Sequence, residues 1–164
     1  MPTNYRGRKD ISNEDSLTLY ASNSVTYISN SEITKGVEYI NNYQVMMSKM
    51  SAEHAGEPSK DGKFRVFTTT MRVLEPKEVC THSYFLIGNT ANKKEAENIR
   101  NYLQTKFVRF LVLLSLSAVN LSKLVFSFVP LLDFSVEWND KKLYEKFGIT
   151  EEETAFIESM IKDF

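Results

Sequence analysis

The stretch that decides the fold is residues 92–114, N-K-K-E-A-E-N-I-R-N-Y-L-Q-T-K-F-V-R-F-L-V-L-L. The Asn92 side chain can cap a helix, and Glu95, three positions later, can return the bond in a capping box. Apolar residues then recur at spacings of three and four, which places them on one helical stripe facing a core: Ala96, Ile99, Leu103, Phe107, Phe110, Leu111 and Leu114. The pattern predicts one long helix.

Upstream of this helix the hydrophobic period is two, which is typical of strands. Candidate strands cover residues 16–20, 24–28, 43–48, 64–74 and 83–87. A short helical turn is expected at residues 38–42 and a polar loop at residues 51–63, which include Gly56, Pro58 and Gly62.

Downstream, residues 126–129 read as a short strand that Pro130 ends. A short helix is expected over residues 140–147, closed by Gly148. Thr150 and Glu153 form a capping box for a last helix, whose expected buried side is Phe156, Ile157, Met160 and Ile161.

These elements predict an α+β fold: a mixed or antiparallel sheet packed with one long helix, plus a short helical C-terminal tail. One domain is expected over residues 1–164. Within it, residues 1–90 are mostly β with loops, residues 91–132 hold the long helix and a strand, and residues 133–164 form the tail.

Composition limits the class of protein. The chain has 164 residues, 42% of them hydrophobic and 25% charged, which suits one globular domain and excludes the disordered class. The single cysteine, Cys80, cannot form an internal disulfide and fits a reducing cytosol. The amino terminus lacks the apolar core of a signal peptide, and the apolar run 107–116 is too short to span a bilayer. We therefore expect a cytoplasmic protein with no membrane partner.

Charge is unevenly distributed along the chain. Residues 1–130 hold 16 Lys and Arg against 12 Asp and Glu, whereas residues 131–164 hold 4 against 9. The body is therefore mildly basic (+4) and the tail acidic (−5). Such a chain can still bind DNA through one face, with moderate salt sensitivity.

Four segments in order carry a resemblance to a known family: S-Y-F-L-I-G (83–88), Q-T-K-F-V-R-F-L-V-L-L (104–114), F-S-F-V-P-L-L-D-F (126–134) and the tail from Trp138 to Ile161. They resemble the carboxy-terminal end of adenine-specific DNA methyltransferases of the Eco57I and TaqI-like restriction-modification group. There they belong to the target-recognition domain, called the TaqI-like specificity domain. T-N-Y-R-G-R-K (3–9) and S-K-M-S (48–51) resemble the start of that domain and one of its strand ends.

The resemblance implies a sequence-recognition module for double-stranded DNA without the catalytic part of the methyltransferase or restriction endonuclease. The Asn-Pro-Pro-aromatic loop of such methylases is missing, because the four prolines are all separate, and no glycine-rich loop for the methyl donor occurs. We therefore expect no catalytic residue, no metal site, no cofactor and no enzymatic activity of its own. S-adenosylmethionine and Mg²⁺ are expected only in the missing part.

Candidate DNA contacts are cationic and amide side chains in the segments that match the family. Arginine forks suit phosphates and guanine edges, and asparagine suits adenine. The competing interpretation is a set of solvated surface charges. The linker at residues 117–123 departs from the family pattern, with Val119 and Leu121. The candidates are Asn4, Arg6, Arg8, Lys9, Lys49, Lys60, Lys63, Arg65, Asn120 and Lys123.

Two alternatives stay open. The chain can be a specificity subunit that docks on a separate methylase. It can also be a small Mg²⁺-dependent nuclease built on Asp61, Glu75 and Lys77, although Pro76 would break the strand that such a site uses. Cys80, His54 and His82 lack metal-ligand spacing, and a Cys80–His82 catalytic pair is less favoured than a half-buried cysteine beside a surface histidine.

Overall fold

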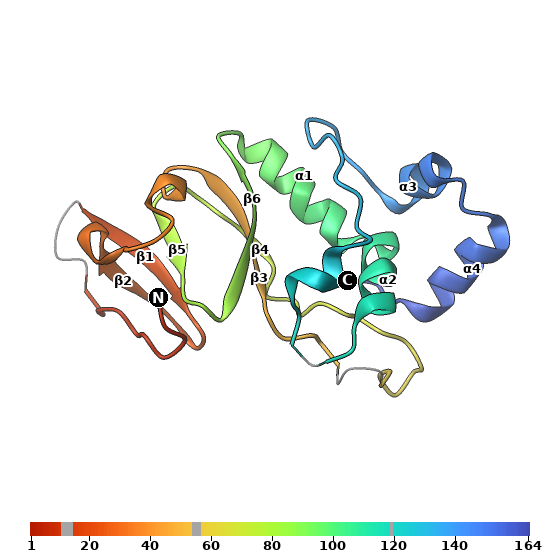
Figure 1. Ribbon diagram of the computed structural model, residues 1–164, viewed down its shortest axis with the longest axis horizontal. Coiled ribbons are helices and arrows are strands. Elements are labelled where there is room, and N and C mark those ends of the chain that lie inside the picture. Colours follow the sequence, from red (N-terminus) through yellow and green to blue (C-terminus); the bar gives the residue numbers. More distant parts are fainter. Residues whose placement is uncertain (11–14, 54–56, 119) are drawn as a thin grey trace.

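The protein is an α+β fold, as the sequence predicts. Its computed structural model describes residues 1–10, 15–53, 57–118 and 120–164. Two three-stranded sheets form one side of the molecule and the helices α2, α3 and α4 the other, with α1 between them (Figure 1). Within the described residues, no helix combines the length and the apolar character needed to cross a membrane.

The first sheet has the strand order β2-β1-β5. Strands β1 (Ser16–Ala21) and β2 (Ser24–Ser29) form an antiparallel hairpin with a two-residue turn, and β5 (Glu78–Cys80) runs parallel to β1. Alternate residues of β1, Leu17 and Leu19, are buried, because side chains on a strand point to opposite faces. With Ile28 and Ile40 they form a small core of this sheet.

The second sheet has the order β4-β3-β6, with β3 (Tyr43–Ser48) between β4 (Arg72–Leu74) and β6 (Tyr84–Thr90). The β3–β6 register shifts between Tyr43 and Val45, which marks a bulge. Gly88 at φ +70° lies in this region, and a Cβ there would come 2.7 Å from Ile99 Cδ1. Only glycine lets the following helix pack this close to the sheet.

The predicted long helix is two helices, α1 (Lys93–Gln104) and α2 (Lys106–Ser115). Thr105 separates them with an extended backbone at ψ 150°. Its hydroxyl donates to the Tyr102 carbonyl at 2.7 Å and accepts from the Val108 N–H at 3.3 Å, so one side chain ends α1 and caps α2. The prediction of a single helix was wrong because the apolar spacing of three and four continues across this break.

The break changes which side of α2 is buried. Phe107 is buried, but Phe110 and Leu111 are only partly covered and Leu114 is 65% exposed. Val108, Val112 and Arg109 are buried instead. The stripe prediction holds for the α1 residues and for Phe107, and is wrong for Leu114, because the extended backbone at Thr105 ends the single helix that one continuous stripe requires.

The start of α1 follows the prediction in part. The Asn92 side chain accepts from the Lys94 and Glu95 N–H groups, which confirms the cap. The reciprocal bond from Glu95 to the Asn92 N–H was predicted wrongly. Thr90 Oγ1 accepts from that N–H at 3.1 Å and donates to the Glu95 carboxylate. Thr90, a residue of β6, therefore connects Asn92 to Glu95.

Within the described residues, one predicted strand is absent and another is shorter than expected. In place of the strand predicted at residues 126–129, the chain forms the 3₁₀ helix η3 (Lys123–Phe126). Of residues 64–74, only β4 is a strand, because Val66 at φ 73° interrupts extended pairing. Short 3₁₀ turns, η1 (Asn30–Glu32) and η2 (Val37–Tyr39), precede β3.

The C-terminal helices agree with the prediction. Helix α3 (Asp140–Phe147) is closed by Gly148 at φ 65°, and α4 (Glu151–Met160) begins with the Thr150–Glu153 capping box. Phe156 was predicted to be buried and is instead 55% exposed. After α4, Ile161 pairs with Phe64 and brings the end of the chain back to the loop before β4.

The larger core lies between the second sheet and the helices. Its buried residues come from β3, the segment 64–71, α1, α2, η3, α3 and α4. Leu143 of α3 and Ile161 are 0% exposed, so the tail is packed onto the body as part of this core.

Candidate functional site

A polar groove of about 710 Å³ opens where the N-terminal segment, the β1–β2 turn, the end of β3 and the start of β6 meet. We call it the hydroxyl groove, because half of its described lining residues are serines and threonines. No Asp or Glu is among them. The lining residues are Thr3, Ser22, Asn23, Ser48, Lys49, Met50, Ser51, Thr68, Thr70, His82, Ser83, Tyr84, Asn120 and Leu121.

Main-chain hydrogen bonds assemble this groove from distant segments. The Lys49 N–H donates to the Ser83 carbonyl at 3.1 Å, and the Leu121 N–H donates to the Lys49 carbonyl at 2.7 Å. Met50 and Asn120 form an isolated antiparallel bridge. The backbone around Lys49 therefore holds the start of β6 on one side and the segment before η3 on the other.

The strongest donors of the groove are Lys49 and His82. Lys49 Nζ lies 3.1 Å from His82 Nδ1 and 5.2 Å from the centre of the Phe85 ring. Because an ammonium group has only donors, Nδ1 accepts this bond and the other imidazole nitrogen carries the hydrogen. An anion entering the groove can therefore meet both the ammonium group and an imidazole N–H.

Hydroxyl groups surround this pair. Ser22 Oγ lies 2.9 Å from Ser83 Oγ and donates to the Thr3 carbonyl, and the Thr68 and Thr70 hydroxyls lie 2.8 Å apart. A hydroxyl can rotate to donate or accept. The groove can thus offer several neutral donors beside one fixed positive charge.

Few of the predicted DNA contacts lie in this groove. Lys49 and Asn120 line it, and exposed Asn4 follows its lining residue Thr3. Arg8 pairs with Tyr27 at the outer side of β2 and forms an ion pair with Glu32 at 2.8 Å. Arg6 and Lys9 are exposed on the same N-terminal segment.

The other predicted contacts lie elsewhere. Lys63 Nζ donates to the Glu158 carbonyl at 3.1 Å, and the Arg65 N–H donates to Glu53 at 2.7 Å; Lys60 is exposed in the loop before them. Lys123 lines a different cavity, of about 560 Å³, between β6, α1 and residues 126–134. The structure thus brings together Lys49 and Asn120 but not the whole set, and each contact role stays a prediction.

Sequence reasoning missed several groove residues. The sequence patterns suggest His82 as a metal ligand, as a catalytic partner of Cys80 or as a surface histidine, but not as an anion contact, and they give no binding role to Thr68, Thr70 or Ser83. A cluster of hydroxyl residues on five separate segments has no periodicity or fixed spacing that would reveal it. The signal present in the sequence, T-H-S at residues 81–83 directly before a strand, is too short to be specific.

The two carboxylates of the nuclease hypothesis, Asp61 and Glu75, form ion pairs with different lysines. Asp61 pairs with Lys162 at 3.0 Å, and that contact helps to lower the Asp61 pKa, whereas Glu75 pairs with Lys93. Lys77 lies in the turn between β4 and β5, at φ 69°. In the described part of the chain, no three His, Cys, Asp or Glu side chains are placed to hold a metal ion. His54 and Val119 lie outside the described residues.

The Cys80 thiol is poorly suited to nucleophilic chemistry. Burial raises its pKa to about 12, which keeps it in the protonated, unreactive form at neutral pH. The positive charge of Lys49 opposes this shift but is the weaker effect.

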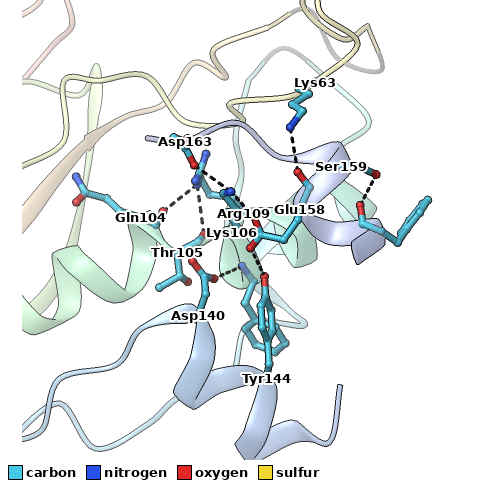
Figure 2. A network of polar contacts seen from close by, with 12 residues as sticks. Lys63, Gln104, Thr105, Lys106, Arg109, Asp140, Tyr144, Glu158, Ser159 and Asp163 are labelled. Carbon is cyan, nitrogen blue, oxygen red and sulfur yellow. Dashed lines mark hydrogen bonds and ion pairs between the residues drawn. The ribbon is translucent and has the colours of Figure 1, made fainter. Parts of the chain in front are cut away.

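A second cluster of polar groups lies where α2, α3, α4 and the C-terminal residues converge (Figure 2). Lys106 forms ion pairs with Glu158 and Asp163, and Tyr144 donates to Glu158 at 3.2 Å. The same carboxylates raise the pKa of Lys106 by hydrogen bonding. These side chains are bonded to one another, so Lys106 of α2, Tyr144 of α3 and Glu158 of α4 connect the three helices.

Arg109 is the buried charge beside that cluster, with 1% of its surface exposed. It donates to three main-chain carbonyls, those of Gln104, Thr105 and Arg65, at 3.0–3.3 Å. Burial lowers its pKa to about 10, so the guanidinium group stays charged at neutral pH. Because the first two carbonyls are those at the C-terminal end of α1, Arg109 stabilises the break between α1 and α2.

The chain matches no protein-family model, and neither a curated protein nor a solved structure matches it. The functional interpretation therefore depends on the residues and their geometry.

Proposed function

We propose that this chain is a recognition module for double-stranded DNA, of the type found in restriction-modification methyltransferases, and that the hydroxyl groove contacts the DNA backbone. The observation that carries the proposal is a groove that combines Lys49, His82 and Asn120 with serine and threonine hydroxyls and has no Asp or Glu among its described lining residues. Lysine, hydroxyl and amide groups are the usual partners of phosphate oxygens.

The groove chemistry also suits base recognition at one point. Asn120 is exposed beside Lys49, and an asparagine amide can bind adenine through two hydrogen bonds. Asn4, Arg6 and Arg8 follow Thr3 along the chain and can extend the contact beyond the groove. Methyl transfer and cleavage belong, in this proposal, to a separate catalytic part that would bind S-adenosylmethionine and Mg²⁺.

The test is binding of a fluorescein-labelled duplex, followed by anisotropy over a range of salt concentrations. We expect Lys49→Ala to weaken binding and to lower the salt slope by about 0.9, the value for one phosphate contact. Lys141→Ala is the matched control, because it removes an equal charge from the exposed face of α3. Absence of binding at low salt, or equal losses in the two variants, would contradict the proposal.

A second candidate function is docking on a separate methylase. Exposed apolar side chains around η3 favour it: Leu124 is 77% exposed, Phe128 66% and Leu131 91%. Indifference to DNA in the salt titration, together with self-association of the chain, would support this function over the first.

A further inference from the structure

An apolar groove of about 420 Å³ separates α2 from α4. Phe110 and Leu111 of α2 form one wall, Phe156 of α4 forms the other, and Ile149 lies in the loop before α4. The Phe110 and Phe156 rings meet edge to face with their centres 5.9 Å apart. We call this the Phe156 groove, and it shares no lining residue with the hydroxyl groove.

The apolar surface continues out of the groove into solvent. Phe156 is 55% exposed, and Leu114, one helical turn beyond Phe110 on α2, is 65% exposed. The phenylalanine and the leucine lie on different helices that pack against each other. Burial of these side chains by a partner would remove exposed apolar surface from water.

The walls decide what shape of ligand fits. Both are α-helices, whose backbone N–H and C=O groups are bonded within the helix. The groove therefore offers no strand edge to which an extended peptide could add. A ligand that satisfies its own backbone, which means a helix with an apolar stripe, fits this surface.

The charges decide which helix fits. Glu152 and Glu153 line the groove, no Lys or Arg does so among the described residues, and Glu151 lies next to them in the first turn of α4. Glu151 and Glu152 have no ion-pair partner in the described part of the chain. Glu153 stays anionic in its capping box, since the Thr150 hydrogen bonds lower its pKa. The complementary partner is basic.

We propose that the Phe156 groove binds one amphipathic helix of another protein, with its apolar stripe against Phe110 and Phe156 and its flanking lysines or arginines paired with Glu152 and Glu153. This binding is a function separate from DNA recognition and does not depend on it.

The experiment uses the full chain and a fluorescent synthetic peptide of about 18 residues, or five helical turns. The peptide has leucines on one stripe and lysines on both flanks. A matched peptide carries glutamates in place of the lysines. We expect the lysine peptide to bind and to become helical in circular dichroism, and the glutamate peptide to bind at least about tenfold more weakly, because each added carboxylate faces another.

Two variants and two matched controls locate the site. Phe156→Ser and Glu152→Lys should each weaken the lysine peptide about five- to tenfold. Leu124→Ser removes an even more exposed apolar side chain from η3, and Glu137→Lys makes the same charge change elsewhere in the acidic tail. Both controls should change affinity less than about twofold. Circular dichroism and an unfolding curve establish that each variant is folded.

Several outcomes would overturn the proposal. One is equal binding of the two peptides, and another is an equal loss in Glu137→Lys and Glu152→Lys, which means adhesion to the acidic tail in general. A third is self-association of the chain that Phe156→Ser abolishes, because the occupant would then be a second copy. No binding of the lysine peptide at low salt also overturns it.

Discussion

The hydroxyl groove and the Phe156 groove differ in both chemistry and construction. The first has Lys49, His82 and many hydroxyls, with no Asp or Glu among the lining residues that the structure describes, and it is built from strand ends and loops. The second has aromatic walls with Glu152 and Glu153, and it is built from two helices. The cationic donors of the first groove and the carboxylates of the second therefore lie on different elements. A nucleic acid and a basic protein segment could then bind without competing for one surface.

The largest expected difference between the two grooves is in stability. Phe107 lies at the base of the Phe156 groove, is 4% exposed and stacks on Phe147 with ring centres 5.2 Å apart. Phe107→Ala should lower the free energy of unfolding by about 3–5 kcal/mol, because it leaves a cavity in the larger core. Met50→Ala, in the hydroxyl groove and 56% exposed, should change it by less than about 0.5 kcal/mol. Urea unfolding measures the free energy of unfolding of both variants. Equal losses in Phe107→Ala and Met50→Ala would contradict the expected difference in stability between the two grooves.

The next effect concerns DNA. Lys49→Glu places a carboxylate among the donors of the hydroxyl groove, where it would repel phosphate, so duplex affinity should fall about tenfold or more. Glu152→Lys makes the opposite charge change in the Phe156 groove and should alter duplex affinity less than about twofold. Anisotropy titrations at one salt concentration compare the two variants. If Glu152→Lys changed duplex affinity more than Lys49→Glu, DNA binding at the hydroxyl groove would be contradicted.

A smaller effect is expected at the start of α4. Thr150→Ala removes the hydroxyl that accepts from the Glu153 N–H at 3.2 Å. Loss of such a cap costs about 1 kcal/mol of stability. It should also weaken the lysine peptide, since Glu152 and Glu153 lie in the turn that the cap orders, and leave duplex affinity unchanged. Ser117→Ala, at an exposed serine after α2, is the control for both measurements.

The smallest effect at neutral pH concerns Cys80. The folded-state pKa of about 12 lies above the unfolded value of 9.0, so the stabilising contribution is complete below pH 9 and is lost as the pH rises toward 12. Thermal unfolding between pH 8 and pH 11 should therefore show a shallower decline for Cys80→Ala. Burial also raises the pKa of Tyr20 and Tyr84 above 10, which leaves a residual decline in the same direction. Fast reaction of the native thiol with a disulfide reagent at pH 8 would contradict this prediction.

Local patterns predicted the elements that depend on nearby residues. The β1–β2 hairpin, β3, the Asn92 cap, and α3 and α4 with Gly148 and the Thr150–Glu153 box were all found where the sequence placed them. Each of these depends on alternation, helical spacing or a capping residue within a few positions. Such interactions form within a short segment, so the order of the residues is sufficient to identify them.

Distant contacts decided the features that the sequence did not predict. Thr105 breaks the helix with a hydroxyl that bonds to both α1 and α2. Arg109, a charged residue within the apolar run 107–116, is buried and donates to carbonyls that include that of Arg65. Val66 at positive φ prevented the long strand expected before β4. Periodicity carries no information about these contacts.

The sequence by itself determined the α+β class, the bounds of β1, β2, β3 and α3, and the separation of a mildly basic body from an acidic tail, because propensity, capping and charge are properties of neighbouring residues. Only the tertiary structure decided that Lys49, His82 and Asn120 share a groove, and that Phe156 and Leu114 face solvent. The physical reason is that three-dimensional proximity arises from packing between segments far apart in the chain. Whether a side chain is buried depends on which of those segments packs against it.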